Sequence, residues 1–179
     1  MALETWKIDP ARSRVQFTVR HMVVSKVRGR FARWDARLQL DLRQPTASSV
    51  EVTLDAASVE TGMADRDAYL RSPDCFDVGK FPSLTYRSRR VEAPSPGRLR
   101  VVGDLTIRAL AREVVLDVEY GSGKKPWGEG RAGFGARASV NRKDFGLAFS
   151  PALETGGLLV GGRVDIEIEL QATAPGGAR

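Results

Sequence analysis

The chain has 179 residues, a formal net charge of +6, one cysteine and one histidine. This length is typical of one domain with a core that needs neither disulfides nor metal ions. Cys75 has no second cysteine to pair with, and Cys75 and His21 together are too few ligands for a zinc or iron site. We expect a single domain over residues 1–172, followed by a disordered Pro/Gly-containing tail at 173–179.

Most of the chain alternates apolar with polar residues, which is the pattern of strands that bury one face. The clearest example is Arg163–Leu170. We predict strands near residues 5–9, 13–24, 29–42, 48–58, 82–91, 97–109, 112–121, 130–140 and 158–172. The first segment can be interpreted as an extension of the second through a bend at Asp9-Pro10. Eight strands then remain, which predicts an all-β fold, an eight-stranded antiparallel barrel closed on itself.

One helix is predicted between the strands, at residues 63–71. Asp65 and Asp67 lie in its early turns, where the helix dipole favours negative charge. Ser72-Pro73 follows, and a proline disfavours a helical conformation in the residue before it. An apolar loop occupies residues 75–82. We expect this short helix and loop to cover one end of the barrel as a lid.

The inward positions of the predicted strands are almost entirely apolar, and several are small. The small ones are Ala32, Ala36, Ala56, Ser88, Gly103, Ala136, Ala138 and Gly162. Because protein interiors contain few empty voids, these residues favour a cavity that holds an apolar ligand. Alternatively, they only accommodate strand curvature and bulges.

The residues expected to line this cavity are large and mostly apolar. They are Phe17, Val19, Met22, Trp34, Leu38, Leu54, Tyr86, Leu105, Ile107, Phe134 and Ile166. Met63, Leu70, Phe76 and Phe81 are expected to close one end.

Few polar residues are placed to meet a ligand. His21 ends an apolar face at the predicted rim of the barrel, so it is either a structural histidine or a contact for a ligand head group. Arg142 lies at a predicted chain turn and is expected at the barrel mouth, whereas Arg66 and Asp67 are interpreted as structural contacts. No two titratable residues are visibly placed for acid–base catalysis, which favours a binding protein without a cofactor over an enzyme.

The positive charge is concentrated in one segment. Nine basic residues lie from Arg12 to Arg43, against only Asp35 and Asp41. This segment fits a solvated outer face, or alternatively a surface that binds nucleic acid or an anionic membrane. The chain begins without an apolar run, so we expect a soluble, cytoplasmic protein. In the leading interpretation it binds no nucleic acid and makes at most transient contact with membrane surfaces.

Several short motifs, in this order and spacing, resemble the YceI-like family. They are Trp6–Asp9, Val15-x-Phe17, Arg20–Ser25, Gly29–Phe31, Thr61-Gly62, Arg66–Ser72, Phe76-Asp77, Phe81-Pro82, Gly103–Ile107 and Asn141–Gly146. The resemblance covers about residues 5–172 and implies an extended lipocalin-like barrel. It also implies that the barrel carries or stores a polyisoprenoid, such as a polyprenyl quinone, and is often a homodimer. Arg12 and Ala109 depart from the family pattern, which expects histidine and glycine there.

Overall fold

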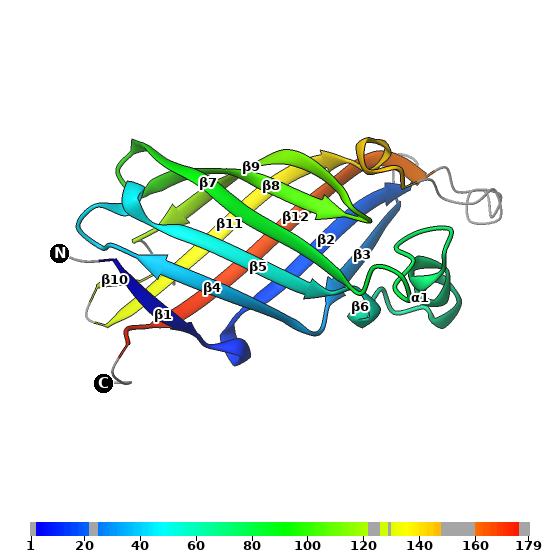
Figure 1. The fold of residues 1–179 in the computed structure, drawn as a ribbon, viewed down its shortest axis with the longest axis horizontal. Coiled ribbons are helices and arrows are strands. Elements are labelled where there is room, and N and C mark those ends of the chain that lie inside the picture. The colour runs from blue at the N-terminus through cyan, green and yellow to red at the C-terminus, as the bar shows by residue number, and fades with distance from the viewer. Residues whose placement is uncertain (1–2, 22–24, 122–125, 129, 148–159, 176–179) are drawn as a thin grey trace.

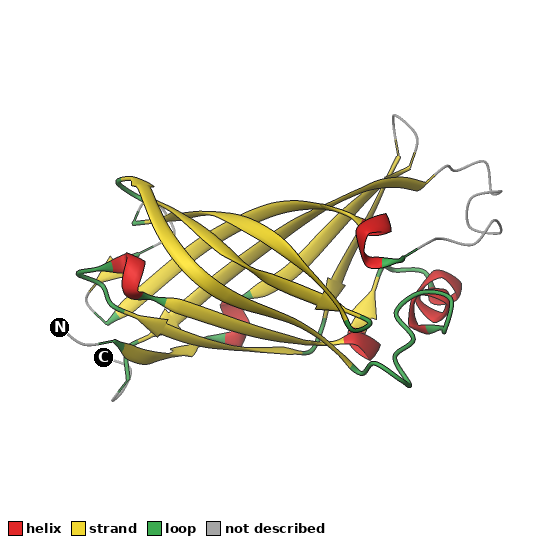
Figure 2. Cartoon of the chain, turned by 45° about the horizontal axis from the view of Figure 1, so that its top comes forward, coloured by secondary structure: helices red, strands yellow, loops and turns green. Residues whose placement is uncertain are grey.

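A computed structural model describes residues 3–21, 25–121, 126–128, 130–147 and 160–175, most of which form one barrel (Figures 1 and 2). The strands are β1 (Glu4–Ile8), β2 (Arg14–His21), β3 (Ser25–Phe31), β4 (Trp34–Leu40), β5 (Ser49–Asp55), β6 (Val59–Glu60), β7 (Ser83–Ser95), β8 (Arg98–Ile107), β9 (Leu110–Tyr120), β10 (Trp127–Gly128), β11 (Arg131–Asn141) and β12 (Val160–Thr173). The helices are α1 (Ala64–Arg71) and the 3-10 turns η1 (Pro10–Arg12), η2 (Pro45–Ala47), η3 (Ala56–Ser58) and η4 (Arg142–Phe145).

The strands close into a ring. Hydrogen-bonded neighbours follow the order β11, β9, β8, β7, β5, β4, β1 and β12. The ring closes because β12 also pairs with β11, the first strand of this series. Every pairing between the described strands is antiparallel. The predicted eight-stranded antiparallel barrel is therefore confirmed.

The predicted bend at Asp9-Pro10 joins two halves of one barrel strand. Both β1 and β2 pair with β12, at Ile8↔Ala172 and at Arg14↔Glu169 respectively. Between them, the Asp9 carboxylate accepts a hydrogen bond of 3.1 Å from the Ala11 amide. Pro10 fits the start of η1, where its missing N–H is not needed.

The predicted strand 29–42 is broken at Ala32 and Arg33. The Ala32 amide donates to the Ser58 carbonyl at 3.1 Å, and the Arg33 amide donates to the Ser58 hydroxyl at 3.0 Å. Ala32 and Arg33 are both exposed, so the alternation of buried and exposed residues shifts by one position here. As a result Phe31, and not Ala32, is buried. The expectation that Ala32 faces inward was wrong, because the Ser58 contacts change the phase of the strand at this point.

Helix α1 lies at one end of the barrel, beyond β6 (Figure 1). It is held there by polar contacts, because buried Asp67 accepts a 2.8 Å hydrogen bond from the Thr61 amide and Arg66 Nε donates to Thr61 Oγ1 at 2.8 Å. Arg71 donates to two carbonyls of the η3–β6 segment at 2.9 and 3.0 Å. The interpretation of Arg66 and Asp67 as structural contacts agrees with this geometry.

Met63 does not share the buried face of the helix with Leu70. It is the N-cap residue, with an extended backbone (φ −130°), and 54% of it is exposed, whereas Leu70 is only 5% exposed. The helix begins at Ala64 rather than at the predicted residue 63, so Met63 lies outside its helical turns. At the other end of the chain, β12 continues through Thr173, and the Ala174 amide donates to the Gly130 carbonyl at 2.9 Å. Residues 176–179 of the predicted tail lie outside the described residues.

Candidate functional site

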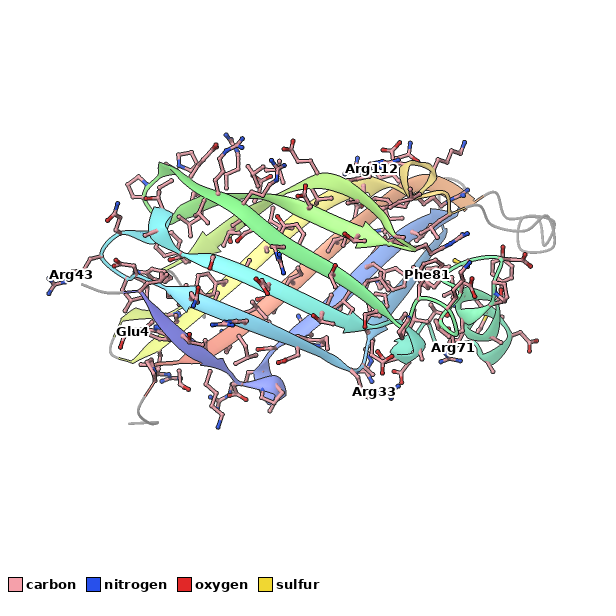
Figure 3. All side chains as sticks on the ribbon, in the orientation of Figure 1. Glu4, Arg33, Arg43, Arg71, Phe81 and Arg112 are labelled. Atoms are coloured by element: carbon pink, nitrogen blue, oxygen red, sulfur yellow. The ribbon has the colours of Figure 1, made fainter. Side chains whose placement is uncertain are left out.

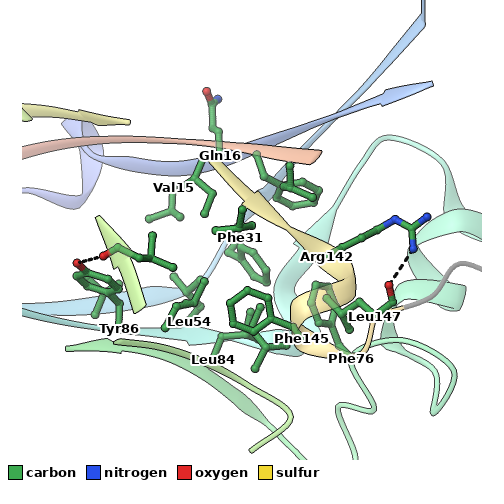
Figure 4. Close-up of a pocket in the computed structure, with 18 of the residues that line it drawn as sticks. Val15, Gln16, Phe31, Leu54, Phe76, Leu84, Tyr86, Arg142, Phe145 and Leu147 are labelled. Carbon is green, nitrogen blue, oxygen red and sulfur yellow. Dashed lines mark hydrogen bonds between the residues drawn. The ribbon is translucent and has the colours of Figure 1, made fainter. Parts of the chain in front are cut away.

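The barrel contains an apolar cavity at the α1 end, which we call the proximal cavity (Figure 4). Its volume is about 130 Å³, roughly ten times the 10–15 Å³ that one water molecule needs. Phe31 lies between two other aromatic lining residues, with ring centroids 5.8 Å from Phe17 and 6.0 Å from Phe76. Aliphatic side chains from β2, β5, β8, β9 and β12 form most of the remaining wall. The surface is therefore suited to contact with hydrocarbon.

A second, distal cavity of about 70 Å³ lies toward the end where both termini are found (Figure 1). Leu38, Phe134 and Leu170 are among its lining residues. An aromatic cluster packs beyond it: the Trp127 ring centroid is 5.4 Å from that of Phe134 and 4.4 Å from that of Tyr120. Three aliphatic side chains line both cavities, and they are Val52, Leu116 and Ile168.

Most residues predicted to line a cavity lie at one of these two. Ten line the proximal cavity: Phe17, Val19, Leu54, Leu70, Phe76, Tyr86, Leu105, Ile107, Arg142 and Ile166. Leu38 and Phe134 line the distal cavity. Half-buried Trp34 and Phe81 and exposed Met63 are not among the described residues that line either one. Met22 and the side chain of His21 lie outside the described part of the structure.

Sequence reasoning missed several lining residues, most clearly Phe31, Phe145 and Leu147. Phe31 was overlooked because the predicted alternation did not include the break at Ala32. Phe145, only 2% exposed, was not among the predicted lining residues, and it belongs to η4, at the predicted chain turn. An apolar residue inside a polar turn motif is the signal that could have identified it.

Small residues do not create the cavities, contrary to the sequence-based expectation. A Cβ atom on Gly103 would lie 2.7 Å from the Tyr86 ring, so this ring fills the space that the glycine leaves. Likewise, the Phe17 ring covers Gly29. Of the eight small residues that suggested a cavity, only Ala136 is among the described lining residues. At Gly103 the neighbouring Tyr86 ring fills the space, as expected because an empty void costs contact energy.

Tyr86 is fixed against the barrel wall by its hydroxyl group. This group lies 2.9 Å from the Val114 carbonyl and 3.3 Å from the Val101 carbonyl, and its proton can be donated to either. Burial raises the pKa of the Tyr86 hydroxyl, so it remains a neutral donor. Tyr86 therefore contributes a rigid aromatic surface to the proximal cavity.

Arg142 is one of the residues that line the proximal cavity, but its guanidinium group turns away from the apolar residues (Figure 4). Nη1 donates to the Leu147 carbonyl at 2.8 Å, and Arg142 is only 5% exposed. Gly146 between them has φ +70°, a conformation that glycine adopts easily. Arg142 thus holds the η4 turn, which places Phe145 and Leu147 against the cavity.

The ionisable side chains among the described lining residues are those of Cys75, Tyr86 and Arg142. Within the described residues, no group of three or more His, Cys, Asp or Glu side chains is arranged to hold a metal ion. In the same part of the chain, no helix has the length and hydropathy needed to cross a membrane. What the cavities offer is an extended apolar surface.

The sequence model of the YceI-like domain family matches residues 6–172 of this chain. The chain belongs to the YceI-like family. It is 36% identical to a UPF0312 protein of Vibrio cholerae over 138 residues, covering 76% of this chain and 73% of the relative. A UPF0312 protein of Staphylococcus epidermidis is 34% identical over 164 residues, which cover 90% of this chain and 93% of the relative. The resemblance seen in the sequence motifs is confirmed.

Two solved structures have the same fold as this YceI-like chain. BcnA of Burkholderia cenocepacia superposes with a TM-score of 0.82 at 23% identity, covering 93% of this chain and all of that one. A polyisoprenoid-binding domain from Saccharophagus degradans, implicated in plant cell wall breakdown, has a TM-score of 0.71 at 17% identity. This match covers 97% of the YceI-like chain and all of the neighbour.

The basic segment of this YceI-like protein is spread over the barrel exterior. Arg33 and Arg43 lie beyond opposite ends of strand β4, at the lower edge and at the left end of the barrel in Figure 3. Arg30 forms an ion pair of 3.0 Å with Glu60, and Arg33 forms one of 2.8 Å with Asp55. The hydrogen bond from Arg33 also lowers the pKa of Asp55. These contacts agree with a solvated outer face, and a surface that binds nucleic acid or anionic membranes stays the alternative interpretation.

We expect Cys75 to react with thiol reagents only after unfolding. It is 2% exposed, and burial raises the pKa of its thiol to about 11. At pH 8 the reactive thiolate is then roughly one molecule in a thousand. Alkylation by iodoacetamide, followed by mass spectrometry, should be slow in buffer and complete in urea. Equal labelling rates under the two conditions would contradict the burial of this thiol.

Proposed function

We propose that this YceI-like protein binds one long apolar chain, a polyisoprenoid or a similar lipid, along the inside of the barrel. The observation that carries the proposal is the pair of apolar cavities lying within one closed barrel. The fold neighbour from Saccharophagus degradans, a polyisoprenoid-binding domain, supports this ligand class. Binding of this kind requires no catalytic residue, and storage or transport of the lipid follows as the proposed role.

The energetics favour such a ligand. Each buried methylene contributes ~0.8 kcal/mol, so a chain of about 20 carbons gains roughly 16 kcal/mol before costs. Association and ordering cost about 4–15 kcal/mol. A chain that fills much of the barrel can therefore bind tightly without charged contacts, and a short chain binds more weakly because it buries fewer methylenes.

Organic extraction of the freshly purified protein tests the proposal. We expect mass spectrometry of the extract to show an apolar lipid at about one molecule per chain. Protein stripped of lipid should regain the same ratio when a long prenol is added. A folded protein that yields no lipid and also takes up no prenol would overturn the proposed function.

We further propose that the protein is cytoplasmic and that it is a homodimer, the dimer being what the family resemblance implied. Light scattering should then give twice the 19.6 kDa mass of one chain. A mass of 19.6 kDa at micromolar concentration would contradict the dimer and leave the lipid-binding proposal unaffected.

A further inference from the structure

The two cavities follow one another along the same strands. On each of three strands, successive inward residues line first the distal cavity, then both cavities, then the proximal cavity. These series are Val50, Val52 and Leu54 on β5; Val118, Leu116 and Val114 on β9; and Leu170, Ile168 and Ile166 on β12. Because inward residues recur every second position, each step advances about 7 Å along a strand. Three separate strands thus place their shared residue at the junction of the two cavities.

The shared residues, Val52, Leu116 and Ile168, form what we call the waist of the barrel. Val52 and Leu116 are each 6% exposed, and Ile168 packs against the same core. All three side chains are aliphatic and form only packing contacts, so they can move by changing rotamer. Neighbouring Tyr86, in contrast, is fixed by its hydrogen bond to Val114. The waist is therefore a movable constriction beside a fixed part of the wall.

The sizes of the two cavities make the waist important for ligand length. The proximal cavity, of about 130 Å³, accepts a chain of limited length without any change at the waist. The end of a longer chain meets Val52, Leu116 and Ile168. It must push these side chains apart before it reaches the distal cavity, of about 70 Å³. Up to the waist, each added methylene should raise affinity by about fourfold. At the waist this gain is offset by the loss of contacts between the three side chains.

Resting on the proposed function, we propose that the waist determines which lengths of apolar chain bind tightly. Short chains occupy the proximal cavity alone. Intermediate chains gain little from their added carbons because they end against the waist. Long chains pass through it and gain affinity again in the distal cavity. The dependence of affinity on chain length then has a step at the waist.

The test uses prenols of increasing length, from geraniol through farnesol and geranylgeraniol to solanesol, in competition with the neutral dye N-phenyl-1-naphthylamine. In the Leu116→Phe variant the waist is narrower. Because Leu116 lines both cavities, all prenols are expected to bind less tightly, but the affinity for the longer prenols should fall at least tenfold more than the affinity for geraniol and farnesol. In Leu116→Ala the step should disappear. Val52→Leu should narrow the waist by a smaller amount, and it provides the same comparison if Leu116→Phe does not fold.

Leu84→Phe is the matched control, because Leu84 lines only the proximal cavity and is 5% exposed. It should weaken all prenols by a similar factor. If the folded waist variants also change the affinity for all lengths equally, the waist does not select length, although the protein binds lipid. If no prenol displaces the dye from the wild type and none binds directly, the proposed function fails together with this inference.

Discussion

Replacing Gly103 with alanine should destabilise the barrel by about 3 kcal/mol, at the upper end of the range for overpacked cores. The added Cβ would lie 2.5 Å from the Arg87 carbonyl oxygen and 2.7 Å from the Tyr86 ring. The ring lines the proximal cavity, and the carbonyl belongs to the backbone of β7, which pairs with β8 at Ser88↔Gly103. The substitution therefore strains the sheet and also obstructs the cavity.

Urea unfolding followed by tryptophan fluorescence measures this effect. Gly79→Ala is the matched control, because the same methyl group would there have no atom within 4 Å. We expect Gly79→Ala to change the free energy of unfolding by less than about 0.5 kcal/mol. Gly103→Ala should also bind the apolar dye more weakly. Equal stability of the two variants would show that the Tyr86 ring does not occupy the space beside Gly103.

Replacing Phe145 with alanine should cost about 3–5 kcal/mol of unfolding free energy. Phe145 is 2% exposed, is one of the largest fully buried side chains among the described residues, and lies against the proximal cavity. Removing the ring enlarges a cavity that is already present. We expect the neighbouring side chains to relax little into the enlarged space, so that most of the cost of the lost contacts remains. For a chain of this length, each kcal/mol lowers the melting temperature by about 2–4 °C.

Phe81→Ala provides the comparison for this substitution. Phe81, labelled in Figure 3, lies in the loop between α1 and β7. It is half-buried, and the Lys80 ammonium lies 5.6 Å from its ring centroid. It should lose less than half as much stability as Phe145→Ala. Differential scanning calorimetry of both variants without ligand measures the difference. A smaller loss for Phe145→Ala than for Phe81→Ala would mean that η4 does not pack into the barrel as described.

The alternation of apolar and polar residues was enough to predict the antiparallel barrel. Each strand must bury one face, and a period of two residues leaves few other arrangements for eight strands. The bend at Pro10 was also predictable, because proline restricts the backbone locally. The family followed from motifs such as Arg66–Ser72 and Asn141–Gly146, and the structure shows that these motifs hold α1 and η4 in place.

The phase of β3 and β4, and the origin of the cavities, could not be obtained from a local pattern. Ala32 and Arg33 break the strand because they bond to Ser58, which lies 25 residues beyond Arg33. Gly103 leaves no cavity, because Tyr86 on the neighbouring strand covers it. Both results depend on contacts between segments distant in the sequence. A strand pattern shows which side chains point inward, but the space left between them depends on how all the strands pack together.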